Sequence, residues 1–145
     1  MEAFIENPAG QTLKQEFDEK TNTWDKKGNL AVPYPFPYGF IKRTLQEDGD
    51  PLDVFLITKK ESNAGSGAVF EIELLGLIEY FESNERDYKI LAKITGEDIA
   101  LDEEVKKKLK YFLIHAFDNI PGKKVEFKGF FGKENALTEI NKCQI

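Results

Sequence analysis

Two apolar segments, residues 69–80 and 87–94, constrain the fold more than any other part of the chain. Apolar and polar side chains alternate along much of both, which is the period of a β-strand with one buried face. The first segment is long enough to bend, and Gly76 marks the expected bend. A polar turn over residues 82–86 joins the two segments, so the sequence predicts two successive strands.

Shorter segments are also predicted to be extended. Residues 1–29 suit a strand pair, and prolines at every second position of residues 33–37 bar a helix. The apolar run 52–57 can pair with residues 40–41 across an acidic turn, as a hairpin-like unit. Residues 125–128 alternate in polarity and predict one more strand.

Helical periodicity appears late in the chain. Apolar residues recur at helical spacing over residues 102–117, with Asp102 as a good N-cap, and a shorter helix is expected over residues 133–142. Strands followed by helices favour an α+β protein, mainly β, built as a small antiparallel barrel with helical additions. No repeat or linker divides the chain, so we expect a single domain spanning residues 1–145.

Charge and composition argue against several classes of function. The net charge of −6 disfavours general nucleic-acid binding, which usually needs a basic face. The apolar runs are too short for a membrane span, and residues 1–6 lack the features of a signal peptide. We therefore expect a cytoplasmic protein without nucleic-acid or membrane partners. Cys143 is the only cysteine, so no internal disulfide can form.

The acidic turn carries Asp48, Asp50 and Asp53 within six residues. Carboxylates this close repel one another, and hard divalent cations such as Mg²⁺, Mn²⁺ or Ca²⁺ would neutralise them. A solvated acidic turn before a strand is the alternative. An EF-hand calcium loop is disfavoured, because its twelfth position, which should be Glu, is Lys59.

A second charged group lies downstream of this turn. Asp87 and Lys89 are two residues apart and share one strand face, and Glu82 can reach the same place from the neighbouring turn. Lys14 and Glu16 repeat this mixture of acid and base on an earlier strand. Acids that hold metals, next to lysines that hold phosphate oxygens, are typical of phosphoryl transfer to water.

In these elements the chain resembles the soluble family I inorganic pyrophosphatases. The shared elements, in the family's order, are Glu6, Lys14 and Glu16, then Tyr34-Pro35-Phe36-Pro37-Tyr38-Gly39-Phe40-Ile41, then Asp48-Gly49-Asp50-Pro51-Leu52-Asp53-Val54, then Glu82, Asp87 and Lys89. The resemblance implies a five-stranded OB-like antiparallel barrel with two C-terminal helices packed on it. It also implies hydrolysis of pyrophosphate to two phosphates by a metal-activated water, with Mg²⁺ or alternatively Mn²⁺, in a homo-oligomer.

The same resemblance implies a role for each site residue. The implied general base is Asp50. The implied metal ligands are Asp48, Asp53, Asp87, Glu82 and Glu6, with Asp53 bridging two ions. The implied substrate-binding residues are Lys14, Tyr38, Lys89, Lys26 and Tyr34, and Glu16 would support Lys14.

This chain departs from the family pattern at three places. Glu82 stands where the family has Asp, and Lys26 or Lys27 stands where it has an arginine, which loses bidentate geometry. The family's late helix ends in a Tyr-Lys pair that holds the leaving phosphate, and the match here is Ala116-Phe117. Lys110 and His115 are candidate replacements if the helix is shifted.

Two alternative functions follow from these departures. A relaxed leaving-group pocket would suit a hydrolase of another phosphoanhydride with the same metal centre. A barrel that binds metal and phosphate without turnover is the second alternative, although it would have no need of Asp50.

Overall fold

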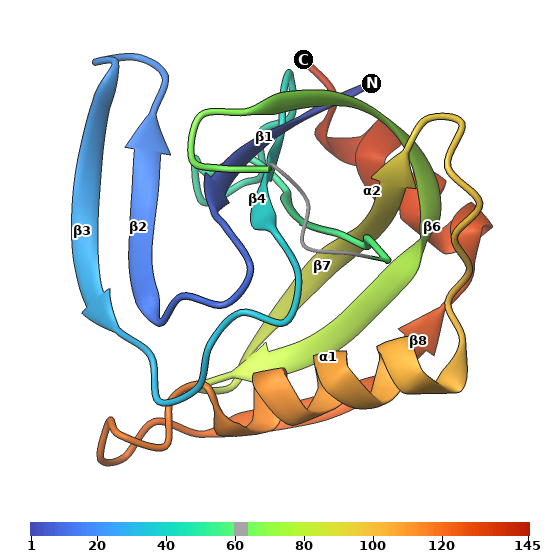
Figure 1. The fold of residues 1–145 in the computed structure, drawn as a ribbon. Coiled ribbons are helices and arrows are strands. Elements are labelled where there is room, and N and C mark those ends of the chain that lie inside the picture. The colour runs from blue at the N-terminus through green and yellow to red at the C-terminus, as the bar shows by residue number, and fades with distance from the viewer. Residues whose placement is uncertain (60–63) are drawn as a thin grey trace.

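The computed structural model describes residues 1–59 and 64–145, and its largest sheet closes into a ring (Figure 1). The strand order is β1 (Glu2–Asn7), β4 (Tyr38–Ile41), β5 (Asp53–Leu56), β7 (Glu85–Ile94), β6 (Val69–Glu82) and β8 (Val125–Phe131). β1 also pairs with the first residues of β6, which closes five strands into a barrel, and β8 pairs with the last residues of β6. The predicted five-stranded OB-like barrel is confirmed, with β8 as an addition and β5–β7 as a parallel pair.

A separate hairpin stands beside the barrel. It consists of β2 (Leu13–Asp18) and β3 (Thr23–Asn29), and it confirms the strand pair predicted in residues 1–29. The ring of Phe17 stacks on Phe4 of β1 with centroids 4.8 Å apart, and the Asn7 amide donates to the Gln15 carbonyl oxygen. These contacts fix the hairpin, and with it Lys14 and Glu16, against one end of the barrel.

The strands around the acidic turn pair as expected, and two glycines shape them. Gly39 of β4 lies opposite both Ile5 and Val54, so strands approach it from two sides. A Cβ added at Gly39 would run into the carbonyl oxygen of Phe4. The β6–β7 register shifts between Leu74 and Gly76, which confirms the bend predicted for this strand.

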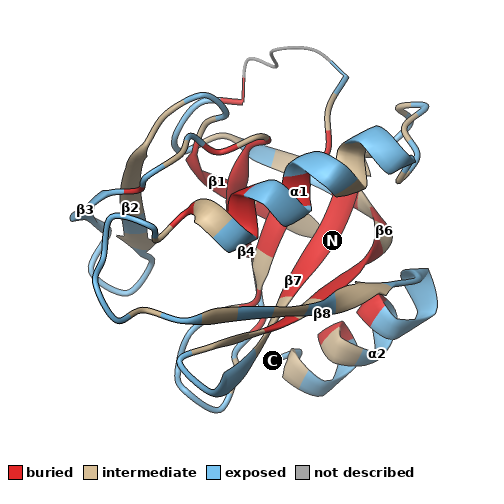
Figure 2. Cartoon of the chain, turned by 90° about the horizontal axis from the view of Figure 1, so that it is seen from below, coloured by how far each residue is buried: buried red, intermediate tan, exposed pale blue. Residues whose placement is uncertain are grey.

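Both predicted helices are present and pack on the strands (Figure 2). Helix α1 (Glu103–His115) begins after Asp102, whose carboxylate accepts the Val105 N–H at 2.9 Å. Helix α2 (Lys133–Cys143) follows β8. Neither helix is both long enough and apolar enough to cross a bilayer, among the residues that the structure describes.

Strand β5 is buried on both faces. Val54 and Leu56 join a core cluster that includes α2 residues, whereas Phe55 and the following Ile57 join a second cluster with α1 residues. Both alternating sets of apolar side chains are therefore buried, one in the cluster that contains α2 residues and the other in the cluster that contains α1 residues.

Candidate active site

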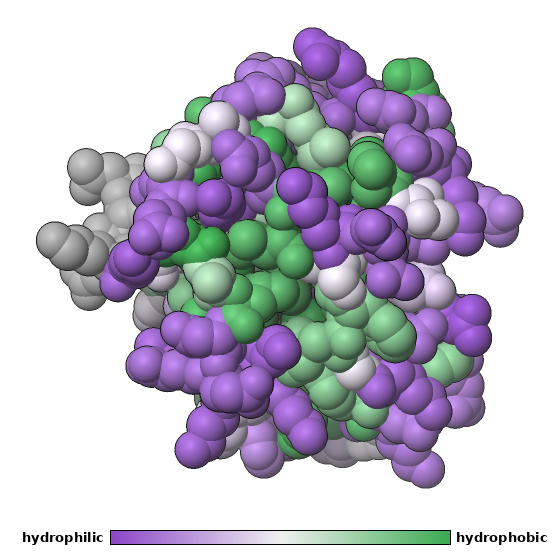
Figure 3. Space-filling model, turned by 90° about the vertical axis from the view of Figure 1, so that its right-hand side faces the viewer, coloured by the Kyte–Doolittle hydropathy of each residue, from purple (hydrophilic) through white to green (hydrophobic). Residues whose placement is uncertain are grey.

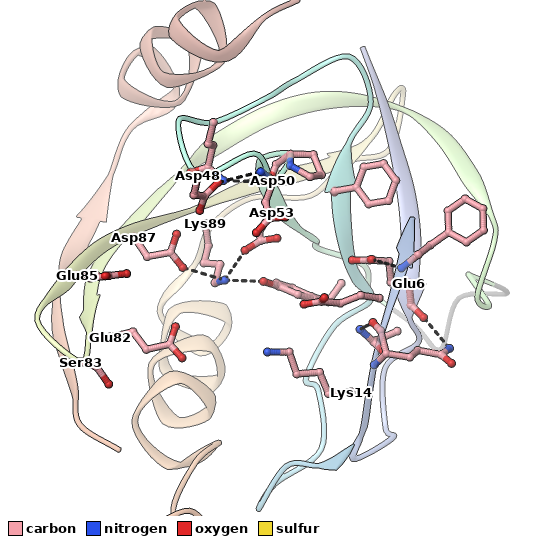
Figure 4. A pocket seen from close by; sticks show the side chains of 18 of the residues that line it. Glu6, Lys14, Asp48, Asp50, Asp53, Glu82, Ser83, Glu85, Asp87 and Lys89 are labelled. Atoms are coloured by element: carbon pink, nitrogen blue, oxygen red, sulfur yellow. Dashed lines mark hydrogen bonds and ion pairs between the residues drawn. The ribbon is translucent and has the colours of Figure 1, made fainter. Parts of the chain in front are cut away.

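The acidic turn, the start of β5, the first half of β7 and strand β2 of the hairpin surround a cavity of about 450 Å³ (Figure 4). Eight carboxylates line it: Glu6, Glu16, Asp48, Asp50, Asp53, Glu82, Glu85 and Asp87. Four cations accompany them: Lys14, Arg86, Lys89 and Lys123. Of the site residues that the sequence predicts, all except Lys26 and Tyr34 line this cavity, so the structure brings the two charged groups together.

The acidic turn has a defined local structure. The Asp48 carboxylate accepts the Asp50 backbone N–H at 2.9 Å, an arrangement that favours Asp at the start of a turn. Gly49 between them has φ +91°, a conformation that side chains disfavour. The turn thereby presents Asp48 and Asp50 at the cavity, while Asp53 enters it from the first position of β5.

Lys89 is the buried cation at the centre of this site. The parallel register of β5 and β7 places Asp53 opposite Lys89. The Lys89 ammonium lies 2.6 Å from the Asp53 carboxylate, 3.2 Å from that of Asp87 and 2.5 Å from the Tyr38 hydroxyl. Burial works to lower the pKa of Lys89, yet Asp53 and its other neighbours raise it well above its usual value. Lys89 is therefore a permanent positive charge in the cavity.

Asp50 differs from the other acids in its environment. Its pKa is raised above the ordinary value by desolvation and by the nearby charges of Asp48, Glu16 and Asp53. A carboxylate with a raised pKa is a stronger proton acceptor. Asp50 is also solvent-exposed, so a water molecule can reach it.

Glu6 is the most strongly perturbed acid of the cavity. Burial, with smaller contributions from Asp53 and Glu16, raises its pKa from 4.5 to about 8, although the Phe17 N–H donates to its carboxylate at 2.7 Å. Burial outweighs that hydrogen bond because the side chain has little contact with water. Without a bound cation, Glu6 therefore keeps its proton at neutral pH.

This protonation predicts how stability depends on pH. In chelator, the folded chain holds a proton on Glu6 between pH 4.5 and about 8, whereas the unfolded chain releases it. The contribution of Glu6 to the free energy of unfolding therefore falls as pH rises through this window, by on the order of a few kcal/mol. Glu6→Gln keeps an acceptor for Phe17 and should flatten this slope in urea titrations from pH 5 to pH 8.

Glu47→Gln is a matched control for this prediction, because Glu47 is exposed and does not line the cavity. It should keep the pH slope of the unaltered chain. An equal slope in the Glu6→Gln variant would contradict the assignment of this proton to Glu6.

The donor set suits a hard divalent cation. Among the described residues, no three acidic, histidine or cysteine side chains already stand together as a ligand group. Several of these carboxylates instead form ion pairs: Asp53 and Asp87 face Lys89, and Glu82 faces Lys123. Carboxylates nevertheless outnumber cations eight to four in the cavity, and carboxylate oxygens are the ligands that Mg²⁺, Mn²⁺ and Ca²⁺ prefer.

A smaller recess of about 50 Å³ adjoins this cavity. Tyr34 lines the recess rather than the cavity, together with Ala116 and Phe117, the residues that replace the expected Tyr-Lys pair. Neither Lys110 nor His115 lines the cavity or the recess: the Lys110 ammonium lies over the Phe127 ring, and His115 pairs with Asp118. The helix is thus not shifted in a way that brings either candidate replacement to the site.

The hairpin lysines are placed differently from each other. Lys27 lies 2.8 Å from Asp25 and 3.7 Å from Glu16, and Lys26 stands opposite Gln15 in the β2–β3 register. Neither lines the cavity, so the structure leaves the expected role of Lys26 in binding substrate as a prediction.

A family model for inorganic pyrophosphatases matches residues 3–145 of this chain. The chain belongs to the inorganic pyrophosphatase family. A family member from Nanoarchaeum equitans is 38% identical over 98% of this chain and 94% of its own length. One from Aquifex pyrophilus is 34% identical over 95% of this chain and 84% of its own length. The solved structure of the Coxiella burnetii pyrophosphatase superposes with a TM-score of 0.88 at 28% identity, covering 99% of this chain and 92% of that one.

Membership in the pyrophosphatase family confirms the resemblance that the sequence motifs suggested, and the structural likeness confirms the barrel. A divalent metal requirement goes with the family, and the acid-rich cavity fits it. Sequence reasoning missed three charged residues of the cavity, Glu85, Arg86 and Lys123. It also missed Tyr80, whose hydroxyl donates to Asp87 at 2.9 Å. None of them lies in a recognisable motif, and only the pairing of β6 with β7 and β8 brings them near the other acids.

Proposed function

We propose that this chain hydrolyses inorganic pyrophosphate to two phosphates with Mg²⁺ as its metal ion, Mn²⁺ being the alternative. One observation carries the proposal: in a chain of the pyrophosphatase family, the acidic turn, Lys89 and Tyr38 meet in a single cavity. The same cavity combines carboxylates for cations with lysines for the phosphate anion. This combination supports pyrophosphate as the substrate.

The chain's own residues divide the reaction between them. Asp50 accepts a proton from the attacking water, whose oxygen bonds to one phosphorus as the bridging P–O bond breaks. Lys14, Tyr38 and Lys89 hold the phosphate under attack, and Glu16 supports Lys14. Asp48, Asp53 and Asp87 would hold the first metal, with Asp53 shared with a second, and Glu82 and Glu6 would hold the outer ones. Bound cations supply charge neutralisation and a lowered pKa of water.

Phosphate release tests this function directly. We expect the purified chain to release phosphate from pyrophosphate in the presence of Mg²⁺, and to lose this activity when excess chelator is added. A nucleoside di- and triphosphate panel at the same concentrations is the control for substrate class. Turnover of nucleotides but not of pyrophosphate would overturn the proposal.

The adjoining recess favours one second candidate. Because Leu30, Ala116 and Phe117 give it partly apolar walls, an organic substituent on a phosphoanhydride could enter it. That hydrolase would use the same Asp50 and metal ligands, and the nucleotide panel distinguishes it. A chain that binds pyrophosphate without any turnover would instead be a metal- and phosphate-binding barrel.

We also propose that the chain forms a single domain and acts in the cytoplasm as a homo-oligomer. Apolar side chains gather on one face of the molecule (Figure 3). Large apolar side chains are also exposed on β8 and α2, at Phe131 and Leu137. Such a surface supports association between copies, which stays a prediction.

A further inference from the structure

Lys123 lies in the loop between α1 and β8 and reaches the cavity. Its ammonium is 2.6 Å from the Glu82 carboxylate, and its side chain is only 26% exposed. The loop is anchored next to it, because the Ser83 N–H donates to the Lys124 carbonyl oxygen and Glu82 pairs with Val125 across β6 and β8. The backbone therefore holds Lys123 at the cavity wall.

The Phe117 ring lies close to the ammonium groups of two cavity lysines, Lys14 and Lys123. The Lys123 ammonium lies 3.9 Å from the centroid of the Phe117 ring, and the Lys14 ammonium lies 5.7 Å from it. An aromatic face attracts ammonium groups and holds them without neutralising their charge. Lys14 and Lys123 thus both line the cavity, although they come from opposite ends of the chain.

The acids divide the cavity into two sides. In Figure 4, Asp50 belongs to the acidic turn on one side and Glu82 lies on the other, with Lys89 between them. If Asp50 activates the water, the phosphorus nearer to Asp50 is attacked, and the phosphate on the Glu82 side leaves. That phosphate needs a cation as the bridging bond breaks and negative charge develops on it.

We infer that Lys123 binds the leaving phosphate of the diphosphate substrate. This inference rests on the proposed function. In the free protein the Lys123 charge is neutralised by Glu82. If Glu82 held a metal cation instead, the Lys123 ammonium would lose this carboxylate partner and would be available to bind the diphosphate. Lys123 thereby supplies the positive charge that Ala116 and Phe117 cannot.

Substitution of Lys123 tests the inference by steady-state kinetics. Lys123→Met is expected to lower kcat/KM for pyrophosphate by about 10- to 100-fold, as expected for losing a charged hydrogen bond to phosphate. Lys123→Arg should recover most of the loss. Lys124→Met is the matched control, because Lys124 is exposed, lines neither the cavity nor the recess, and should leave kcat/KM unchanged. Unchanged kcat/KM in Lys123→Met would overturn the inference.

A second measurement separates substrate binding from mere neutralisation of Glu82. Calorimetry with methylenediphosphonate, a diphosphate analogue that cannot be hydrolysed, gives affinity without turnover. Lys123→Met should weaken this affinity by about 10-fold or more, both alone and in the Glu82→Gln background. Normal affinity in the Glu82→Gln background would show that Lys123 acts only as a counter-ion and would overturn the inference.

The two proposals fail in different ways. A chain that releases no phosphate from pyrophosphate would refute the proposed function, and the methylenediphosphonate titration would still decide whether Lys123 binds a diphosphate. An active chain whose Lys123 variants behave normally would refute the inference about Lys123 and leave the proposed function standing.

Discussion

The Asp50→Asn variant is expected to lose about 10²- to 10⁴-fold in kcat for pyrophosphate, the usual contribution of a general base. Asn has nearly the same shape as Asp and accepts hydrogen bonds, but it cannot take a proton at neutral pH. The raised pKa of Asp50, caused by desolvation and the charge of Asp48, suits it to this role. Because Asp50 is exposed, the fold should tolerate the change.

Two measurements test whether the loss of kcat comes from the missing proton acceptor at Asp50. Asp98→Asn alters an exposed carboxylate outside the cavity and should leave kcat unchanged. Calorimetric titration with Mg²⁺ should show nearly equal affinity in the Asp50→Asn variant, because the metal ligands are assigned to other acids. A variant that retained kcat within tenfold would assign the base to another group.

The Gly39→Ala variant is expected to be the most destabilising of the substitutions considered. Its new Cβ would overlap the Phe4 carbonyl oxygen, and this backbone atom is fixed by the pairing of β1 with β4. Strands must separate to relieve the clash, at a cost of roughly 3 kcal/mol or more. Urea denaturation followed by far-ultraviolet circular dichroism measures the change in the free energy of unfolding.

Gly65→Ala is the control for this second expectation. An added Cβ at Gly65 meets nothing within 4 Å, and its φ lies outside the left-handed region. We expect its free energy of unfolding to stay within about 0.5 kcal/mol of that of the unaltered chain. Similar stability in the two variants would mean that β1 and β4 do not approach as closely as described.

Local sequence patterns predicted much of the fold because the interactions they report are local. The acidic turn, the hairpin-like unit of β4 and β5, and the helix capped by Asp102 each depend on residues close together in the chain. The bend at Gly76 was predictable for the same reason. By contrast, the two faces of β5 are buried in clusters that include helices from the far end of the sequence. The residues of β5 alone therefore do not show that both faces are buried.

The sequence motifs predicted most of the candidate site, but they did not predict Lys123, the cation next to Glu82. Asp53, Asp87 and Lys89 stand in recognisable positions, and the structure brings them together as expected. Lys123 follows a Pro-Gly break in a lysine-rich stretch, where nothing distinguishes it from Lys124. Only the β6–β8 register decides which of the two faces the cavity.

The parallel pairing of β5 and β7 also bears on how the protein folds. It joins Asp53 to Lys89 across 36 positions of the chain, and contacts between such distant segments cost loop-closure entropy and tend to form late. A divalent cation that needs these residues binds the native chain and not the unfolded one. It then adds about 1.4 kcal/mol to stability for each tenfold excess of its concentration over Kd. A divalent cation bound in the cavity would thus also stabilise the long-range pairing of β5 with β7.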